Sequence, residues 1–94
     1  MLNVRAHITI SGRVQGVFFR SEILRKANKL GITGWVQNLF DGKVEALFEG
    51  EEKLVRMLIE YCKRGPKSAL VTHLDVKWEA YKGEFGRFKI KYGY

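Results

Sequence analysis

Five stretches of the chain carry the pattern of β-strands, in which apolar and polar side chains alternate or apolar residues form a short run. The alternation is clearest from Val4 to Ile10. Asp41-Gly42 is a tight-turn signal between the second and third stretches, so these two are predicted to form a hairpin. The predicted strands cover residues 4–10, 32–39, 43–49, 71–79 and 88–92.

Two further stretches have apolar residues at the spacing of an amphipathic helix. Residues 19–30 form the first and end at Gly31, a typical C-terminal stop. Residues 51–64 form the second, which opens on two glutamates that suit the positive end of the helix dipole. The order β-α-β-β-α-β-β predicts an α+β fold, the ferredoxin-like split β-α-β sandwich, with an antiparallel sheet, two helices on one face and one additional C-terminal strand.

The length of 94 residues predicts a single domain over residues 1–94, and 46% hydrophobic residues suffice for one core. A single cysteine, Cys62, excludes an internal disulfide, and its place on an apolar helix stripe predicts a buried, inert thiol. We find no signal-peptide pattern and no apolar run near the roughly 20 residues of a membrane span. These features predict a cytoplasmic protein that does not bind membranes.

The net charge of +7 is unevenly distributed. Residues 1–31 carry six basic and one acidic side chain, a net +5, whereas residues 32–65 carry five and six, a net −1. Such an excess can belong to an ordinary solvated surface, or it can steer small anions toward the first third of the chain. Positive charge is also what a nucleic-acid-binding module requires.

The segment from Gly12 to Arg20 joins the first predicted strand to the first predicted helix. Gly12 and Gly16 permit backbone angles that are closed to other residues, and successive backbone amides at a helix start attract an anion. Arg20 lies in the first helical turn, where the dipole disfavours a positive charge unless an anion compensates it. The alternatives are a tight turn without a ligand, a surface arginine, or an ion pair with Glu22 or Asp41.

Asn38 ends the second predicted strand, just before the hairpin turn. An asparagine there often serves the turn itself. Its amide can also hold a water molecule through its oxygen and donate to a substrate oxygen. In a β-α-β unit the loop after the first strand and the ends of later strands can converge, so Arg20 and Asn38 can face one pocket.

Two segments of the chain have long motifs. Residues 12–20 read Gly-x-Val-Gln-Gly-Val-x-Phe-Arg, and residues 34–50 contain Gly-Trp-Val-Gln-Asn-x-x-x-Gly-x-Val and end in Gly50. Both segments resemble the signatures of the acylphosphatase family. The resemblance covers essentially the whole chain with the same element order, and two long motifs at proper spacing are a specific signal. Phe40 replaces the small residue or proline of many members, and Leu39 replaces the hydroxyl residue of some, so backbone groups are expected to hold the Asn38 amide.

The resemblance implies a hydrolase that cleaves the carboxyl–phosphate bond of acyl phosphates by direct attack of water, with neither a metal nor a cofactor. It implies that Arg20 binds the phosphoryl group and that Asn38 positions the water. The expected partners are the small-molecule substrate and, as a competitor, inorganic phosphate or another anion, and the protein is expected to be a monomer. The phosphate-binding loop, through its backbone amides, would consist of Gln15, Gly16, Val17, Phe18 and Phe19.

The alternative function is a small basic ferredoxin-like module that binds nucleic acid. Such modules stack bases on aromatic side chains of the central strands. The third predicted strand, residues 43–49, has two acidic residues and one aromatic residue, which argues against base stacking. His7 and His73 are expected to be structural, because two ligands do not make a metal site.

Overall fold

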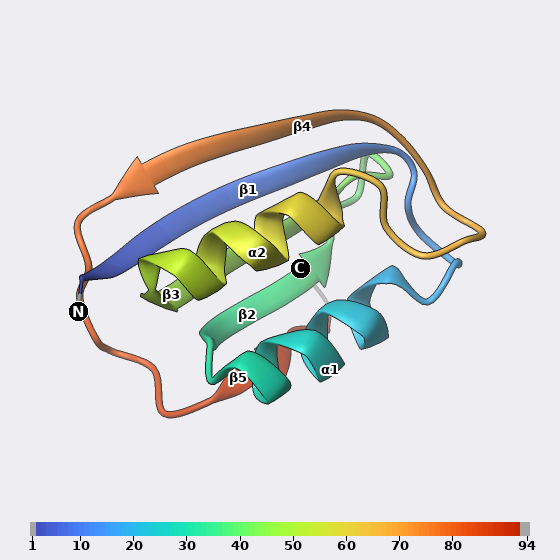
Figure 1. Ribbon diagram of the computed structural model, residues 1–94. Coiled ribbons are helices and arrows are strands. Elements are labelled where there is room, and N and C mark those ends of the chain that lie inside the picture. Colours follow the sequence, from blue (N-terminus) through green and yellow to red (C-terminus); the bar gives the residue numbers. More distant parts are fainter. Residues whose placement is uncertain (1, 93–94) are drawn as a thin grey trace.

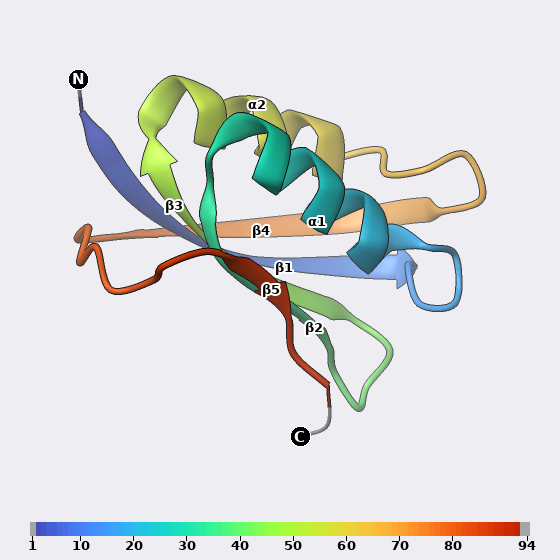
Figure 2. The ribbon, with the colours of Figure 1, turned by 90° about the horizontal axis from the view of Figure 1, so that it is seen from below.

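The computed structural model describes residues 2–92, which form a five-stranded sheet with two helices on one face (Figure 1). Seen from below, both helices lie on the same side of the sheet (Figure 2), which confirms the predicted two-layer arrangement and element order. The elements are β1 (Asn3–Arg13), α1 (Phe19–Leu30), β2 (Thr33–Asn38), β3 (Val44–Glu51), α2 (Glu52–Cys62), β4 (Leu70–Glu79) and β5 (Phe88–Ile90). Neither helix is long and apolar enough to span a membrane.

The strand order in the sheet is β4-β1-β3-β2-β5. Three of the four strand pairs are antiparallel, but β5 pairs parallel with β2, so the expectation of a purely antiparallel sheet is wrong at this edge. The connection after β4 crosses to the opposite edge at the end where β2 begins. A strand that starts there has to run in the same direction as β2.

The first strand is longer than predicted, because pairing with β4 carries it past Ile10 to Arg13. The register of this pair shifts between Ser11 and Gly12, which marks an irregularity of the β-bulge type. A Cβ atom at position 12 would lie 2.1 Å from the carbonyl oxygen of Leu70. Only a glycine allows this approach, so β1 stays paired with β4 up to the start of the β1–α1 connection.

The hydrophobic core lies between the sheet and the two helices. Alternate strand residues such as Ile8, Val36 and Phe48 are fully buried against helix residues such as Ile23 and Val55. Each such side chain contributes roughly 1.5–3 kcal/mol through its removal from water. The thiol of Cys62 is buried in the same core, and burial raises its pKa, as expected for an inert cysteine.

A cluster of charged groups lies at the opposite, helix-free face. Glu49 on β3 has no exposed surface and Arg5 on β1 is 8% exposed. Their side chains are 3.2 Å apart, and Arg5 also bonds Glu79 at 3.1 Å and Glu84 at 2.7 Å. The Glu49 carboxylate accepts hydrogen bonds from the backbone amides of Lys82 at 2.8 Å and Gly83 at 3.2 Å. The cluster therefore fixes the β4–β5 connection to the sheet.

Replacement of Glu49 by glutamine tests this attachment. The Glu49→Gln variant loses the charge that faces Arg5, and we expect its free energy of unfolding to fall by about 3 kcal/mol, because a buried ion pair is broken on one side. Urea denaturation measures the change. Glu60→Gln is the matched control, since Glu60 pairs with Lys63 at the exposed surface and such pairs contribute little. Equal stability of the two variants would contradict the assigned role of Glu49.

The same cluster predicts a dependence of stability on pH. The hydrogen bond from Arg5 lowers the pKa of the Glu84 carboxyl from its ordinary 4.5. The ionised Glu84 carboxylate therefore contributes fully to the stability of the fold above pH 4.5. This contribution is lost as the pH falls through the lowered pKa of Glu84 in the folded state. Glu84→Gln should be less stable than the wild type at pH 7, and the gap should close as the pH is lowered. Unfolding curves at pH 7 and pH 3 check this, and a constant gap would exclude it.

Candidate active site

The loop between β1 and α1 adopts two left-handed backbone conformations. Gly16 has φ 73° and Phe18 has φ 65°. Phe18 is the residue before α1, and no side chain caps the helix there. The first helical hydrogen bond runs from the amide of Glu22 to the carbonyl of Phe18, so the three preceding amides have no partner within the helix. The loop and helix start thus present N–H groups of the kind that bind an anion.

Phe19, which follows, fixes the position of this helix start. Its side chain is buried, and its ring meets that of Tyr61 on α2 edge-on, with the ring centroids 6.3 Å apart. A Cβ atom at Gly65, in the α2–β4 connection, would lie 2.6 Å from the Phe19 ring. The side chain of Phe19 thus belongs to the core, and only its backbone is available to the predicted loop.

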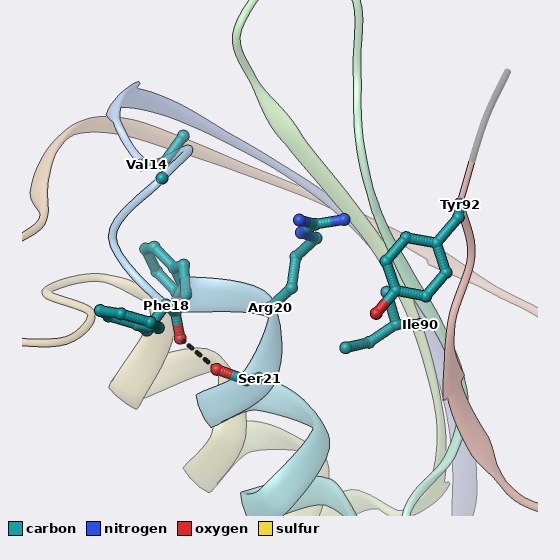
Figure 3. A pocket seen from close by; sticks show the side chains of 8 residues that line it. Val14, Phe18, Arg20, Ser21, Ile90 and Tyr92 are labelled. Carbon is teal, nitrogen blue, oxygen red and sulfur yellow. Dashed lines mark hydrogen bonds between the residues drawn. The ribbon is translucent and has the colours of Figure 1, made fainter.

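Arg20 points into a pocket of about 320 Å³ between Phe18 and Tyr92 (Figure 3). Its guanidinium carbon is 5.4 Å from the centroid of the Tyr92 ring. The two carboxylates considered as alternative partners pair elsewhere, Glu22 with Arg25 at 2.9 Å and Asp41 with Lys43 at 3.8 Å. Within residues 2–92, Arg20 therefore faces the pocket without an acidic partner.

Asn38 ends β2, and its side-chain oxygen is buried without a hydrogen bond to any residue of the described chain. Two backbone hydrogen bonds close the turn that follows. The amide of Leu39 donates to the carbonyl of Lys43 at 2.8 Å, and the amide of Gly42 donates to the carbonyl of Leu39 at 3.2 Å. Backbone groups were expected to hold the Asn38 side-chain amide. For the oxygen of that amide the expectation is wrong, because no group within residues 2–92 bonds it. Turn chemistry does not account for this buried acceptor.

The side chain of Gln15 ties the loop to the β2–β3 hairpin. Its Nε2 donates to the carbonyls of Leu39 at 2.7 Å and Lys43 at 2.9 Å. The sequence patterns pointed to the backbone of Gln15 and missed this side-chain contact. A glutamine beside a glycine is a weak signal, because its partners lie more than 20 residues away.

Strand β5 adds two residues that the sequence patterns did not assign to the site. Ile90 pairs with Val36 of β2, and the amide of Lys91 bonds the Val36 carbonyl at 2.8 Å. Continuing this register brings Tyr92 level with Asn38. Ile90 and Tyr92 line the Arg20 pocket, whereas Asn38 does not line it. Arg20 and Asn38 thus approach the same end of the sheet, Arg20 through its contact with Tyr92 and Asn38 through the register of β2 with β5.

The other polar side chains considered each contact a neighbouring group. The Ser21 hydroxyl donates to the Phe18 carbonyl at 3.0 Å, as expected for a residue at a helix start. His7 contacts Glu45 at 2.6 Å on the helix-free face, and His73 lies on the edge strand β4. In the part of the chain that the structure describes, no three side chains are grouped as metal ligands. What the site presents is the amides of the helix start and the guanidinium of Arg20.

Fold and site together define a small α+β domain whose first helix starts, with free amides of the kind that attract an anion, at the end of its sheet. The acylphosphatase family model matches residues 6–90. An acylphosphatase of Pelotomaculum thermopropionicum is 48% identical over 92 residues, which are 98% of this chain and 100% of that protein. An acylphosphatase of Pyrobaculum calidifontis is 53% identical over 88 residues, which cover 93% of this chain and 80% of the relative.

A solved structure agrees with these relatives. The crystal structure of acylphosphatase from Bacillus subtilis matches with a TM-score of 0.90 at 37% identity, covering 95% of this chain and 99% of that one. The chain belongs to the acylphosphatase family. The resemblance of its two signature segments is thereby confirmed.

The two bonds of Gln15 lead to a test of the loop attachment. In Gln15→Met the side chain keeps its length but donates nothing, so we expect the free energy of unfolding to fall by about 1–2 kcal/mol. We also expect weaker binding of inorganic phosphate, because the loop is no longer fixed to the hairpin. Urea denaturation and titration calorimetry measure the two effects. Unchanged values for both would show that these bonds do not position the loop.

Proposed function

We propose that this protein hydrolyses acyl phosphates to a carboxylate and inorganic phosphate. The observation that carries the proposal is that two groups at one end of the sheet have no ionic or hydrogen-bond partner among the described residues. Within residues 2–92, Arg20 faces the pocket without a carboxylate partner, and the buried oxygen of Asn38 accepts no hydrogen bond. The guanidinium suits a phosphoryl group, and the amide oxygen suits a water molecule.

In the proposed reaction, the phosphoryl oxygens accept hydrogen bonds from the loop amides, from Gln15 to Phe19, and from Arg20. Asn38 accepts a hydrogen bond from a water molecule and aims its oxygen at phosphorus. The new P–O bond forms as the P–O bond to the acyl group breaks, and the carboxylate leaves with that electron pair. The proton of the attacking water passes to an oxygen of the transferred phosphate.

This chemistry places modest demands on the protein. A carboxylate is a good leaving group, so little acid catalysis is needed, and positioning together with charge stabilisation supplies most of the rate. We propose on this ground that the reaction uses neither a metal nor a cofactor. Inorganic phosphate should compete with the substrate because it fits the same donors. We further propose that the protein acts as a cytoplasmic monomer and that residues 1–94 form one domain.

The nucleic-acid alternative is not supported. Phe48, the aromatic residue of β3, is fully buried in the core beneath the helices. Glu45 and Glu49 of the same strand bond side chains on the helix-free face, where bases would have to stack. We propose that the protein does not bind nucleic acid.

Release of phosphate from benzoyl phosphate in metal-free buffer tests the proposal. We expect Arg20→Ala and Asn38→Ala each to lower turnover by roughly 10²-fold, as for lost donors of an oxyanion site. Arg20→Ala should also weaken inhibition by phosphate. The controls are Arg25→Ala and Asn28→Ala, which change the same residue types on the exposed part of α1. Normal turnover by a folded Arg20→Ala or Asn38→Ala variant would remove that residue from the mechanism.

A further inference from the structure

Phe18 has a conformation and an exposure that the fold does not explain. Its backbone is left-handed, with φ 65° and ψ 21°, which is an outlier for a bulky side chain. Its side chain is nevertheless 79% exposed, so packing of the ring against the core offsets little of the backbone strain. A glycine would adopt the same backbone without strain. Strain of this kind at a site is an indication of function.

The position of Phe18 indicates which function the ring has. Phe18 borders the Arg20 pocket from the loop, and Tyr92 borders it from the end of β5 (Figure 3). Ile90 adds a third apolar contact to the same pocket. The pocket thus holds one cation, that of Arg20, and most of the residues that line it are apolar or aromatic. Such a site fits a ligand that joins an anionic group to an apolar one.

We propose that the ring of Phe18 is a specificity-determining contact for the acyl group, which favours acyl phosphates with aromatic or other large apolar acyl groups over acetyl phosphate. The inference rests on the proposed function. The acyl carbon is two bonds from phosphorus, and Phe18 directly precedes the helix whose first amides would hold the phosphoryl group. The acyl group therefore lies within one side-chain length of the ring.

Phe40 provides a matched control for this assignment. It is also an exposed phenylalanine, at 89%, and it lies in the hairpin turn that Gln15 joins to the loop. Unlike Phe18, it does not line the Arg20 pocket. A general effect of exposed rings near the site would appear in variants of both residues, whereas contact with the acyl group would appear only at Phe18.

The test compares kcat/KM for benzoyl phosphate with kcat/KM for acetyl phosphate. We expect Phe18→Ala to lower the ratio of the two values roughly fivefold, the effect of one lost aromatic contact. Phe18→Tyr keeps the ring and should restore the ratio, and Phe40→Ala should leave it at the wild-type value. An unchanged ratio in Phe18→Ala, or an equal fall in Phe40→Ala, would overturn the proposal. Circular dichroism confirms that each variant is folded.

A binding measurement separates this inference from the proposed function. Benzylphosphonate and methylphosphonate are not hydrolysed, and calorimetry gives their affinities for the wild type and Phe18→Ala. We expect the preference for benzylphosphonate to fall by the same roughly fivefold factor in the variant. If the wild type hydrolyses neither acyl phosphate but this preference falls, the proposed reaction fails while the contact stands. If both acyl phosphates are hydrolysed and the preference does not change, the contact is refuted.

Discussion

Burial of the Phe19 ring determines where the first helix begins, and the site depends on that point. The ring packs against Tyr61 of α2 and leaves no room for a side chain at Gly65. With Phe19 turned into the core, its neighbours Phe18 and Arg20 both line the pocket. Directly before this buried ring, the chain passes from β1 into α1 through the left-handed backbone of Phe18. A few residues thus connect core packing to anion binding.

The two halves of the site are brought together by contacts far apart in the sequence. Gln15 bonds carbonyls of the β2–β3 hairpin, and β5 pairs with β2 in a register that brings Tyr92 level with Asn38 and its ring to the Arg20 guanidinium. Each contact is individually modest, since a hydrogen bond contributes about 1 kcal/mol net. Their joint effect is geometric, because catalysis by positioning depends on small displacements of the donors.

Local signals predicted the helix over residues 19–30 without error, because an apolar stripe and a terminal glycine act within a few residues. The ends of β1 and the direction of β5 were not predictable in this way, since both are set by pairing with distant strands. The same holds for the site. Its glycine loop and Arg20 follow from local chemistry, whereas the Gln15 bonds, the contribution of Tyr92 and the isolated oxygen of Asn38 depend on tertiary register.

The charged cluster on the helix-free face belongs to the same argument, although it is remote from the pocket. A buried ion pair is weak evidence for stability, because the loss of hydration offsets much of the attraction. The role of the Arg5–Glu49 pair lies in a further contact, because the Glu49 carboxylate accepts hydrogen bonds from two backbone amides of the β4–β5 connection. This connection leads directly into the short β5, which is three residues long. We infer that the cluster directs the chain across the sheet, so that β5 pairs with β2 in the register that brings Tyr92 to Arg20.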